Sequence, residues 1–143
     1  MKAVKILLVE DNEDHAELVR IALDGKRLVE DFIHRKDGEE ALDFLFEETD
    51  EYERPDLILL DLRLPKVDGL EVLKELKTNS KTRKIPTVIL TTSNNEIDIA
   101  RAYDYHANSY LVKPLDYRKL KQLINNLGEY WLEMNEKPKE TGG

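Results

Sequence analysis

The stretch Leu57-Ile58-Leu59-Leu60-Asp61 joins four consecutive branched apolar side chains directly to a carboxylate. A short apolar run without alternation is typical of a strand that is buried on both faces, as in a parallel sheet. The acid that follows then lies at the carboxyl end of the strand, where open parallel sheets collect their binding residues. The sequence therefore predicts that Asp61 belongs to a binding or catalytic site.

Similar apolar runs occur on both sides of this one. Strands are predicted at residues 4–9, 57–60, 85–90 and 110–112, with a weaker candidate at 28–33. Between them, apolar residues recur at three- and four-residue spacing, which predicts helices. Asn12 is expected to cap the first helix, and Asp37 with Glu40 resembles a capping box that opens the second.

Five strands, each followed by a helix, predict a doubly wound α/β domain with a five-stranded parallel sheet and helices on both faces. A length of 143 residues fits one domain and leaves little room for a second. We expect this domain to span residues 1–134. Residues 135–143 are polar, contain Pro138 and end in Gly-Gly, which predicts a disordered tail.

The composition excludes several classes of function. A formal net charge of -8 argues against a nucleic-acid partner, because binding to phosphates needs a basic face. No apolar run approaches the roughly 18 residues of a membrane span, and no small-residue cleavage pattern follows the N-terminus. The absence of cysteine excludes disulfides and thiolate metal sites, so a cytoplasmic protein is expected.

Reactive side chains follow four of the five predicted strands. They are Glu10 and Asp11 after the first, Asp61 after the third, Thr91 and Thr92 after the fourth, and Lys113 after the fifth. Three close carboxylates raise one another's pKa unless a cation neutralises them, and Mg²⁺ suits such oxygen ligands. A lysine and a hydroxyl suit a phosphoryl group. Each residue alone is a weak signal, but together they predict phosphoryl transfer to a carboxylate.

At these residues the sequence resembles the receiver domain of two-component response regulators, from about residue 5 to residue 131. The resemblance is carried by the motifs Val9-Glu10-Asp11, Asp61-Leu62-Arg63-Leu64-Pro65 with Asp68-Gly69, Thr91-Thr92 and Lys113-Pro114. It implies a flavodoxin-like strand order, 2-1-3-4-5.

The resemblance also implies roles for individual residues. Asp61 would be the phosphoacceptor, and Asp61, Glu10, Asp11 and the backbone carbonyl of Arg63 would hold Mg²⁺. By the same resemblance, Thr91 and Lys113 would bind phosphoryl oxygens. Thr91 would also form the switch together with Tyr110. A cis peptide bond before Pro114 is implied as well, at a residue type where such bonds occur.

The sequence departs from the family pattern at three positions. Glu10 stands where Asp is commoner, His106 occupies a turn where Gly is frequent, and Thr92 is larger than the Ala often found there. Thr92 is expected to restrict access to the phosphoryl group. The paired threonines, the run 108–110 and Trp131 in the last helix look most like stand-alone regulators that pair with phytochrome-type histidine kinases.

The resemblance implies a signalling switch rather than an enzyme. A sensor histidine kinase or a phosphotransfer protein would phosphorylate Asp61, and a target protein or a second copy of the chain would bind the face made by the fourth helix, the fifth strand and the fifth helix. Two alternatives remain: a degenerate receiver that binds partners without phosphorylation, and an aspartyl-nucleophile phosphatase, which Arg63 disfavours because such enzymes place a second Asp there. A nucleotide- or flavin-binding protein lacks support, since no Gly-rich loop follows the first strand.

Several polar residues receive a less specific interpretation. The three histidines, His15, His34 and His106, lie far apart without ligand spacing and are expected on the surface or in turns. The side chain of Arg63 is expected to be solvated, and Trp131 is expected to belong mainly to the core.

Overall fold

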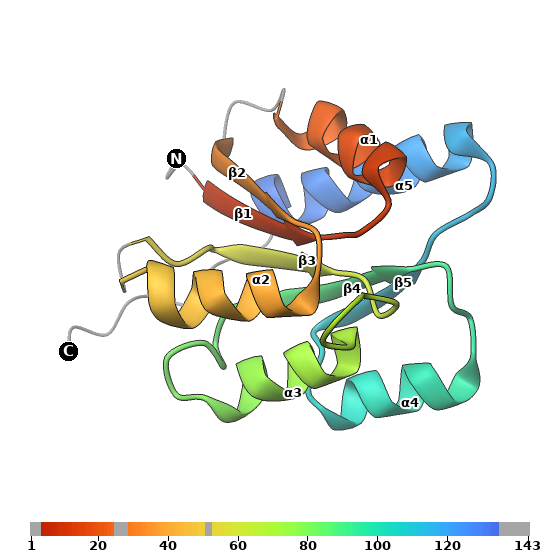
Figure 1. The fold of residues 1–143 in the computed structure, drawn as a ribbon. Coiled ribbons are helices and arrows are strands. Elements are labelled where there is room, and N and C mark those ends of the chain that lie inside the picture. The colour runs from red at the N-terminus through yellow and green to blue at the C-terminus, as the bar shows by residue number, and fades with distance from the viewer. Residues whose placement is uncertain (1–3, 25–28, 51–52, 135–143) are drawn as a thin grey trace.

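The computed structural model describes residues 4–24, 29–50 and 53–134. The predicted tail, residues 135–143, lies outside the described residues. Strands and helices alternate along the chain (Figure 1): β1 Val4–Val9, α1 Glu13–Asp24, β2 Val29–Arg35, α2 Gly38–Asp43 continued by the π-helical η1 Phe44–Glu48, β3 Leu57–Leu60, α3 Gly69–Thr78, β4 Thr87–Thr91, α4 Glu96–Asp104, β5 Ser109–Val112, and α5 Tyr117–Gly128 continued by the π-helical η2 Glu129–Met134.

The five strands form one parallel sheet in the order β2-β1-β3-β4-β5. The predicted doubly wound fold and its flavodoxin-like order are therefore confirmed. Helices α1 and α5 cover one face of the sheet, and α2, α3 and α4 cover the other (Figure 1). Among the described residues, none of the helices combines the length and the apolar composition that crossing a bilayer requires.

The central strands are apolar on both faces because each face meets a helix layer. In β1, Leu7 and Val9 pack toward α2 and α3, whereas Ile6 and Leu8 pack toward α1 and α5. All four side chains are buried, and burying a side chain of this size stabilises the fold by about 1.5–3 kcal/mol. This two-sided burial accounts for the lack of alternation in the sequence.

Strands β1 and β3 have the predicted bounds. Strand β5 begins at Ser109, one residue earlier than predicted, and β2 and β4 also differ. Strand β4 begins at Thr87, two residues later than predicted, because Pro86 has no N–H to contribute to a ladder. The carbonyl of Pro86 still accepts from the N–H of Ile58 at 2.9 Å. Strand β2 extends to Arg35, two residues beyond the prediction, as its backbone continues to pair with β1.

Both predicted helix caps are present. The side chain of Asn12 accepts from the N–H of His15 at 3.1 Å, and that of Asp37 accepts from the N–H of Glu40 at 2.8 Å. The π-helical continuations of α2 and α5 were not predicted, because the spacing of apolar residues does not distinguish them from α-helix. Trp131 lies in η2, half-buried against the core on the α1 and α5 side.

The turn after α4 passes through His106, which is exposed and has a φ of 69°. A side chain in this left-handed region costs roughly 1–2 kcal/mol. Glycine adopts this conformation without that cost, so the turn suits Gly and is formed here by histidine.

We expect His106→Gly to raise the free energy of unfolding by up to about 1 kcal/mol, because the relieved strain exceeds the roughly 0.5–1 kcal/mol of backbone entropy that Gly loses on folding. Urea unfolding measures the change. His106→Ala is the control, since it keeps the Cβ and should gain nothing. A Gly variant no more stable than the Ala variant would show that the turn is unstrained.

Candidate functional site

Strand register brings the predicted site residues to one edge of the sheet. Val9 pairs with Leu60, so Glu10 and Asp61 leave the sheet side by side, and the N–H of Asp61 donates to the carbonyl of Val9 at 3.0 Å. On the other side of β3, at the ends of β4 and β5, the N–H of Lys113 donates to the carbonyl of Thr91 at 2.6 Å.

The loop after β3 is folded tightly around Asp61. The N–H of Gly69 donates to the carbonyl of Leu62 at 2.9 Å, and a Cβ at Gly69 would overlap the backbone carbonyl oxygen of Asp61. Asp68 caps α3 by accepting from the N–H of Leu70 at 2.9 Å. The Asp68-Gly69 motif therefore fixes the start of α3 against the backbone of Asp61.

Three carboxylates meet at this edge. Ligand oxygens of Glu10, Asp11 and Asp61 all lie within 4.8 Å of one another, with Glu10 and Asp61 buried and Asp11 exposed. Two oxygens bound to one hard cation lie no more than about 5 Å apart, so this cluster fits a divalent metal ion with oxygen ligands. The N–H of Arg63 donates to Oδ1 of Asp61 at 3.3 Å, so the backbone of Arg63 borders the same cluster.

Lys113 closes the site from the end of β5. Its ammonium group donates to Oε1 of Glu10 and, at 3.3 Å, to Oδ2 of Asp61. The Lys113 side chain is almost completely buried. A buried cation of this kind is stable only beside anions, and it provides a fixed positive charge for a further anionic group.

Burial and the charge of Asp61 raise the pKa of Glu10 from its ordinary 4.5 to about 7, although Lys113 opposes the shift. Between about pH 4.5 and pH 7, Glu10 therefore binds a proton in the folded protein that it does not bind in the unfolded chain. The negative charge of the cluster is costly without a further cation.

This pKa predicts how the stability of the metal-free protein depends on pH. Between about pH 4.5 and 7 the folded state holds more protons at Glu10, so the contribution of Glu10 to the free energy of unfolding is fully present below pH 4.5 and decreases as the pH rises to about 7. Glu10→Gln should lack this contribution.

His15 acts with the opposite sign in the same range. Its pKa lies below the ordinary 6.5, so its contribution to stability increases as the pH rises toward that value. The quantity to measure is therefore the difference between the native protein and Glu10→Gln, from urea unfolding in the presence of EDTA. A difference that stays constant with pH would contradict the shift at Glu10.

Thr91 and Tyr110 are linked through Ser93. Oγ1 of Thr91 accepts from the N–H of Ser93 at 3.3 Å, and the hydroxyl of Tyr110 donates to the carbonyl of Ser93 at 2.9 Å. Thr91 is fully buried, Tyr110 is half-buried, and Thr92 is exposed. Both predicted switch residues therefore contact the same segment, which follows β4 and leads into α4.

The sequence suggested a solvated side chain for Arg63, but in the structure this side chain binds Asp98. Nη2 of Arg63 donates to Oδ2 of Asp98 at 2.6 Å, and the same oxygen accepts from the hydroxyl of Ser93 at 2.7 Å. The Asp98 side chain is only 12% exposed, whereas that of Arg63 is 62% exposed. The contact joins the loop after Asp61 to α4 across 35 positions of sequence, which local spacing does not predict.

Two histidines lie at the site although the sequence suggested only surface or turn roles for them. Nδ1 of His15 lies 3.0 Å from the ammonium nitrogen of Lys113, 98 positions away in sequence. Nε2 of His34 forms a hydrogen bond of 2.7 Å with the carbonyl of Glu10. Neither belongs to a recognisable motif, because both contacts depend on how α1 and β2 pack beside β1.

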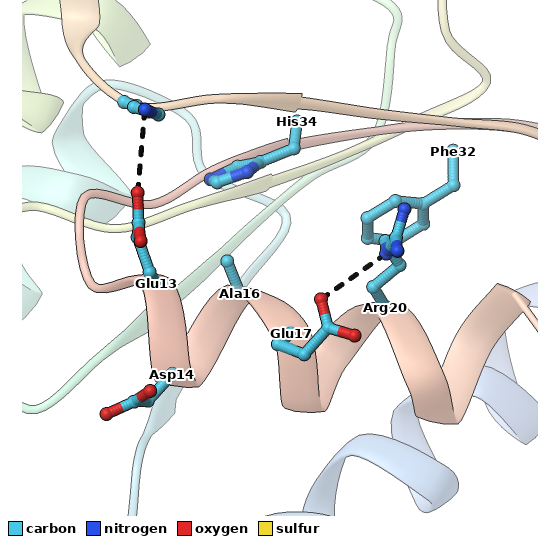
Figure 2. A pocket seen from close by; sticks show the side chains of 8 residues that line it. Glu13, Asp14, Ala16, Glu17, Arg20, Phe32 and His34 are labelled. Atoms are coloured by element: carbon cyan, nitrogen blue, oxygen red, sulfur yellow. Dashed lines mark ion pairs between the residues drawn. The ribbon is translucent and has the colours of Figure 1, made fainter.

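A separate open cleft of about 530 Å³ lies between α1 and β2. Figure 2 shows Glu13, Glu17 and Arg20 on α1 and Phe32 and His34 on β2 as side chains that line this cleft, with Glu17 directed toward Arg20. Glu17 pairs with Arg20 at 3.5 Å, and Glu13 pairs with Lys36 at 3.5 Å. These exposed pairs contribute little free energy, and the cluster of Glu10, Asp11 and Asp61 lies elsewhere. We assign no chemistry to this cleft.

No peptide bond between described residues is cis, and the bond between Lys113 and Pro114 is accordingly trans. The cis bond implied by the resemblance is therefore wrong for this structure. Even before proline, the trans isomer is favoured by about 0.5–1 kcal/mol.

Comparison with known proteins identifies a family for this chain. The model of the response regulator receiver domain matches residues 6–125. The chain is 46% identical over 134 residues to the "Probable methanogenesis regulatory protein FilR2" of Methanothrix harundinacea, covering 93% of this chain and 86% of that protein. It is 44% identical over 131 residues to the response regulator Rcp1 of Synechocystis, covering 90% of this chain and 88% of Rcp1.

Solved structures agree with this result. The crystal structure of the phosphorylated cyanobacterial phytochrome response regulator RcpA matches with a TM-score of 0.90 and 41% identity, covering 96% of this chain and 99% of RcpA. The Mn²⁺-bound form of Rcp1 matches with a TM-score of 0.88 and 42% identity, covering 95% of this chain and 99% of that one. This chain therefore belongs to the response regulator receiver domain family, and a cyanobacterial phytochrome response regulator is among its relatives.

Proposed function

We propose that this protein is a signalling switch of the phytochrome-associated type that accepts a phosphoryl group on Asp61. The observation that carries the proposal is the site itself: a buried carboxylate 3.3 Å from a buried ammonium group, within 4.8 Å of two further acids. Such an arrangement binds a divalent cation and a phosphoryl group together. The receiver is proposed to span residues 1–134.

In the proposed reaction, a carboxylate oxygen of Asp61 attacks the phosphorus atom of the donor and the donor's leaving group departs with the electron pair of its bond to phosphorus. Glu10, Asp11 and Asp61, with the carbonyl of Arg63, would hold Mg²⁺, which neutralises charge on the phosphoryl oxygens. Lys113 pairs with one of these oxygens, and the hydroxyl of Thr91 donates to another. The protein thereby contributes position and charge neutralisation rather than a general acid.

A phosphatase with an aspartyl nucleophile is a weaker candidate. Its second acid would stand at the position of Arg63, and here that side chain is bound to Asp98. No carboxyl at that position is available to protonate a leaving group. The other alternative is a degenerate receiver that binds partners without being phosphorylated. Such a protein would not need the ion pair between Lys113 and Asp61.

The direct test is incubation of the protein with acetyl phosphate and Mg²⁺, followed by mass spectrometry. We expect one added phosphoryl group, removable by hydroxylamine, which cleaves acyl phosphates. A purified phytochrome-type histidine kinase, labelled on its histidine, should transfer its phosphoryl group to the same residue. Absence of label from both donors would favour the degenerate receiver.

We also propose that phosphorylation changes the face made by α4, β5 and α5. The apolar side chains exposed on these elements and on the loop between β5 and α5 are Ile97, Tyr103, Val112, Leu115 and Tyr117. Large apolar side chains that are exposed on neighbouring elements suit a protein interface. A target protein or a second copy of the chain would bind here.

The hydrogen bonds around Ser93 support this coupling. When the hydroxyl of Thr91 turns toward a phosphoryl oxygen, it leaves the N–H of Ser93, and the carbonyl of Ser93 holds Tyr110. Helix α4 buries only Asp98 and Ala102, so it is lightly anchored and among the easier elements to shift. A change at Asp61 can therefore alter α4 through a few contacts.

Binding of beryllofluoride, a phosphoryl mimic, is expected to shift the NMR signals of residues 96–131 as well as those around Asp61. The physical reason is the added negative charge and the three acceptor atoms, which are fluorines in the mimic and oxygens in the phosphoryl group, and which redirect Thr91. Asp98→Ala should reduce the shifts in α4 while preserving those at Asp61. Shifts confined to the Asp61 pocket in the native protein would contradict the proposed switch.

A further inference from the structure

The ammonium group of Lys113 has three acceptors, which come from three different elements. They are Oε1 of Glu10 after β1, Oδ2 of Asp61 after β3, and Nδ1 of His15 in the first turn of α1. An ammonium group has three N–H donors, so each acceptor takes one. Two of the acceptors are carboxylates of the proposed reaction site, and the third is an imidazole.

The contact determines the protonation state of His15. Because an ammonium group can only donate, Nδ1 of His15 must offer its lone pair, and the ring is neutral with its proton on Nε2. Burial and the charge of Lys113 hold the pKa of His15 below its ordinary value, in agreement with a neutral ring. The backbone N–H of His15 donates to Asn12, which fixes the residue at the start of α1.

The three acceptors differ in what happens to them during phosphoryl transfer. Asp61 becomes an acyl phosphate, and Glu10 is a candidate metal ligand, so both change their electrostatic surroundings. His15 takes part in neither event. As a neutral acceptor it also leaves the positive charge of Lys113 intact for the phosphoryl oxygens, which a third carboxylate would not.

We propose that His15 is a positioning residue for Lys113, a role that rests on the proposed phosphorylation of Asp61. His15 orients the ammonium group while its other hydrogen-bond partners are exchanged. The rival explanation is packing alone, since the ring of His15 also meets that of Tyr117 edge to face, with centroids 6.4 Å apart.

Two substitutions separate these explanations. His15→Phe keeps an aromatic ring for Tyr117 but removes the acceptor. His15→Asn removes the ring but can place an amide oxygen near the position of Nδ1. We expect the rate of phosphorylation by acetyl phosphate to fall about tenfold in the Phe variant, the effect of losing one hydrogen bond to a charged group, and to stay within about threefold of native in the Asn variant.

Equal losses in both variants, or a native rate in the Phe variant, would overturn the role of His15. If even the native protein takes up no phosphoryl group, the proposed function fails, and a second measurement still decides the contact. NMR of isotopically labelled imidazole nitrogens in the unphosphorylated protein should show His15 with its proton on Nε2 near neutral pH. A proton on Nδ1 would overturn the inference independently of phosphorylation.

Discussion

Asp61→Asn is expected to take up no phosphoryl group from acetyl phosphate under conditions in which the native protein is labelled. The amide keeps the size and shape of the carboxylate but lacks the anionic oxygen that attacks phosphorus. Folding should be preserved, because Lys113 keeps Glu10 and His15 as acceptors. Removing one of two adjacent negative charges also lowers the repulsion on Glu10.

Asp68→Asn provides the matched control. Asp68 lies in the same loop, and its side chain caps α3, a role that Asn performs about as well. This variant should be labelled as the native protein is. Mass spectrometry with and without hydroxylamine measures both proteins. Undiminished labelling of Asp61→Asn would mean that another residue is the acceptor.

The position of Asp61 followed from the sequence because two local facts determine it. A run of apolar residues with no polar alternation is buried on both faces, and the residue after such a strand lies at the sheet edge where parallel strands end. The same reasoning placed Glu10, Thr91 and Lys113 at that edge, and the strand register brings them there. The roles of these residues remain proposals.

The contacts that surround this edge did not follow from the sequence. His15 contacts Lys113 across 98 positions, and Arg63 contacts Asp98 across 35. Such pairs depend on how helices α1 and α4 pack against the sheet, and no spacing rule records that packing. A histidine in the first turn of a helix is indistinguishable from a surface residue until the helix is placed.

Mg²⁺ is expected to raise the melting temperature of the native protein and to have little effect on that of Asp11→Ala. A ligand at about one hundred times its dissociation constant stabilises the folded state by about 2.7 kcal/mol, which corresponds to roughly 5–10 °C for a domain of this size. Asp11 is the exposed member of the acidic cluster, so its removal leaves the buried core intact. Phosphorylation that depends on Mg²⁺ should be lost together with the thermal shift.

Without metal, Asp11→Ala should melt at the native temperature or slightly above it, because one of three clustered negative charges has gone. Asp14→Ala is the control: it removes an exposed acid three positions away, in the first turn of α1 and outside the cluster, and should keep the full response to Mg²⁺. Differential scanning calorimetry in EDTA and in Mg²⁺ compares the three proteins. A metal-free melting temperature lowered by several degrees in Asp11→Ala would mean that Asp11 is structural. An unchanged response to Mg²⁺ would place the cation elsewhere.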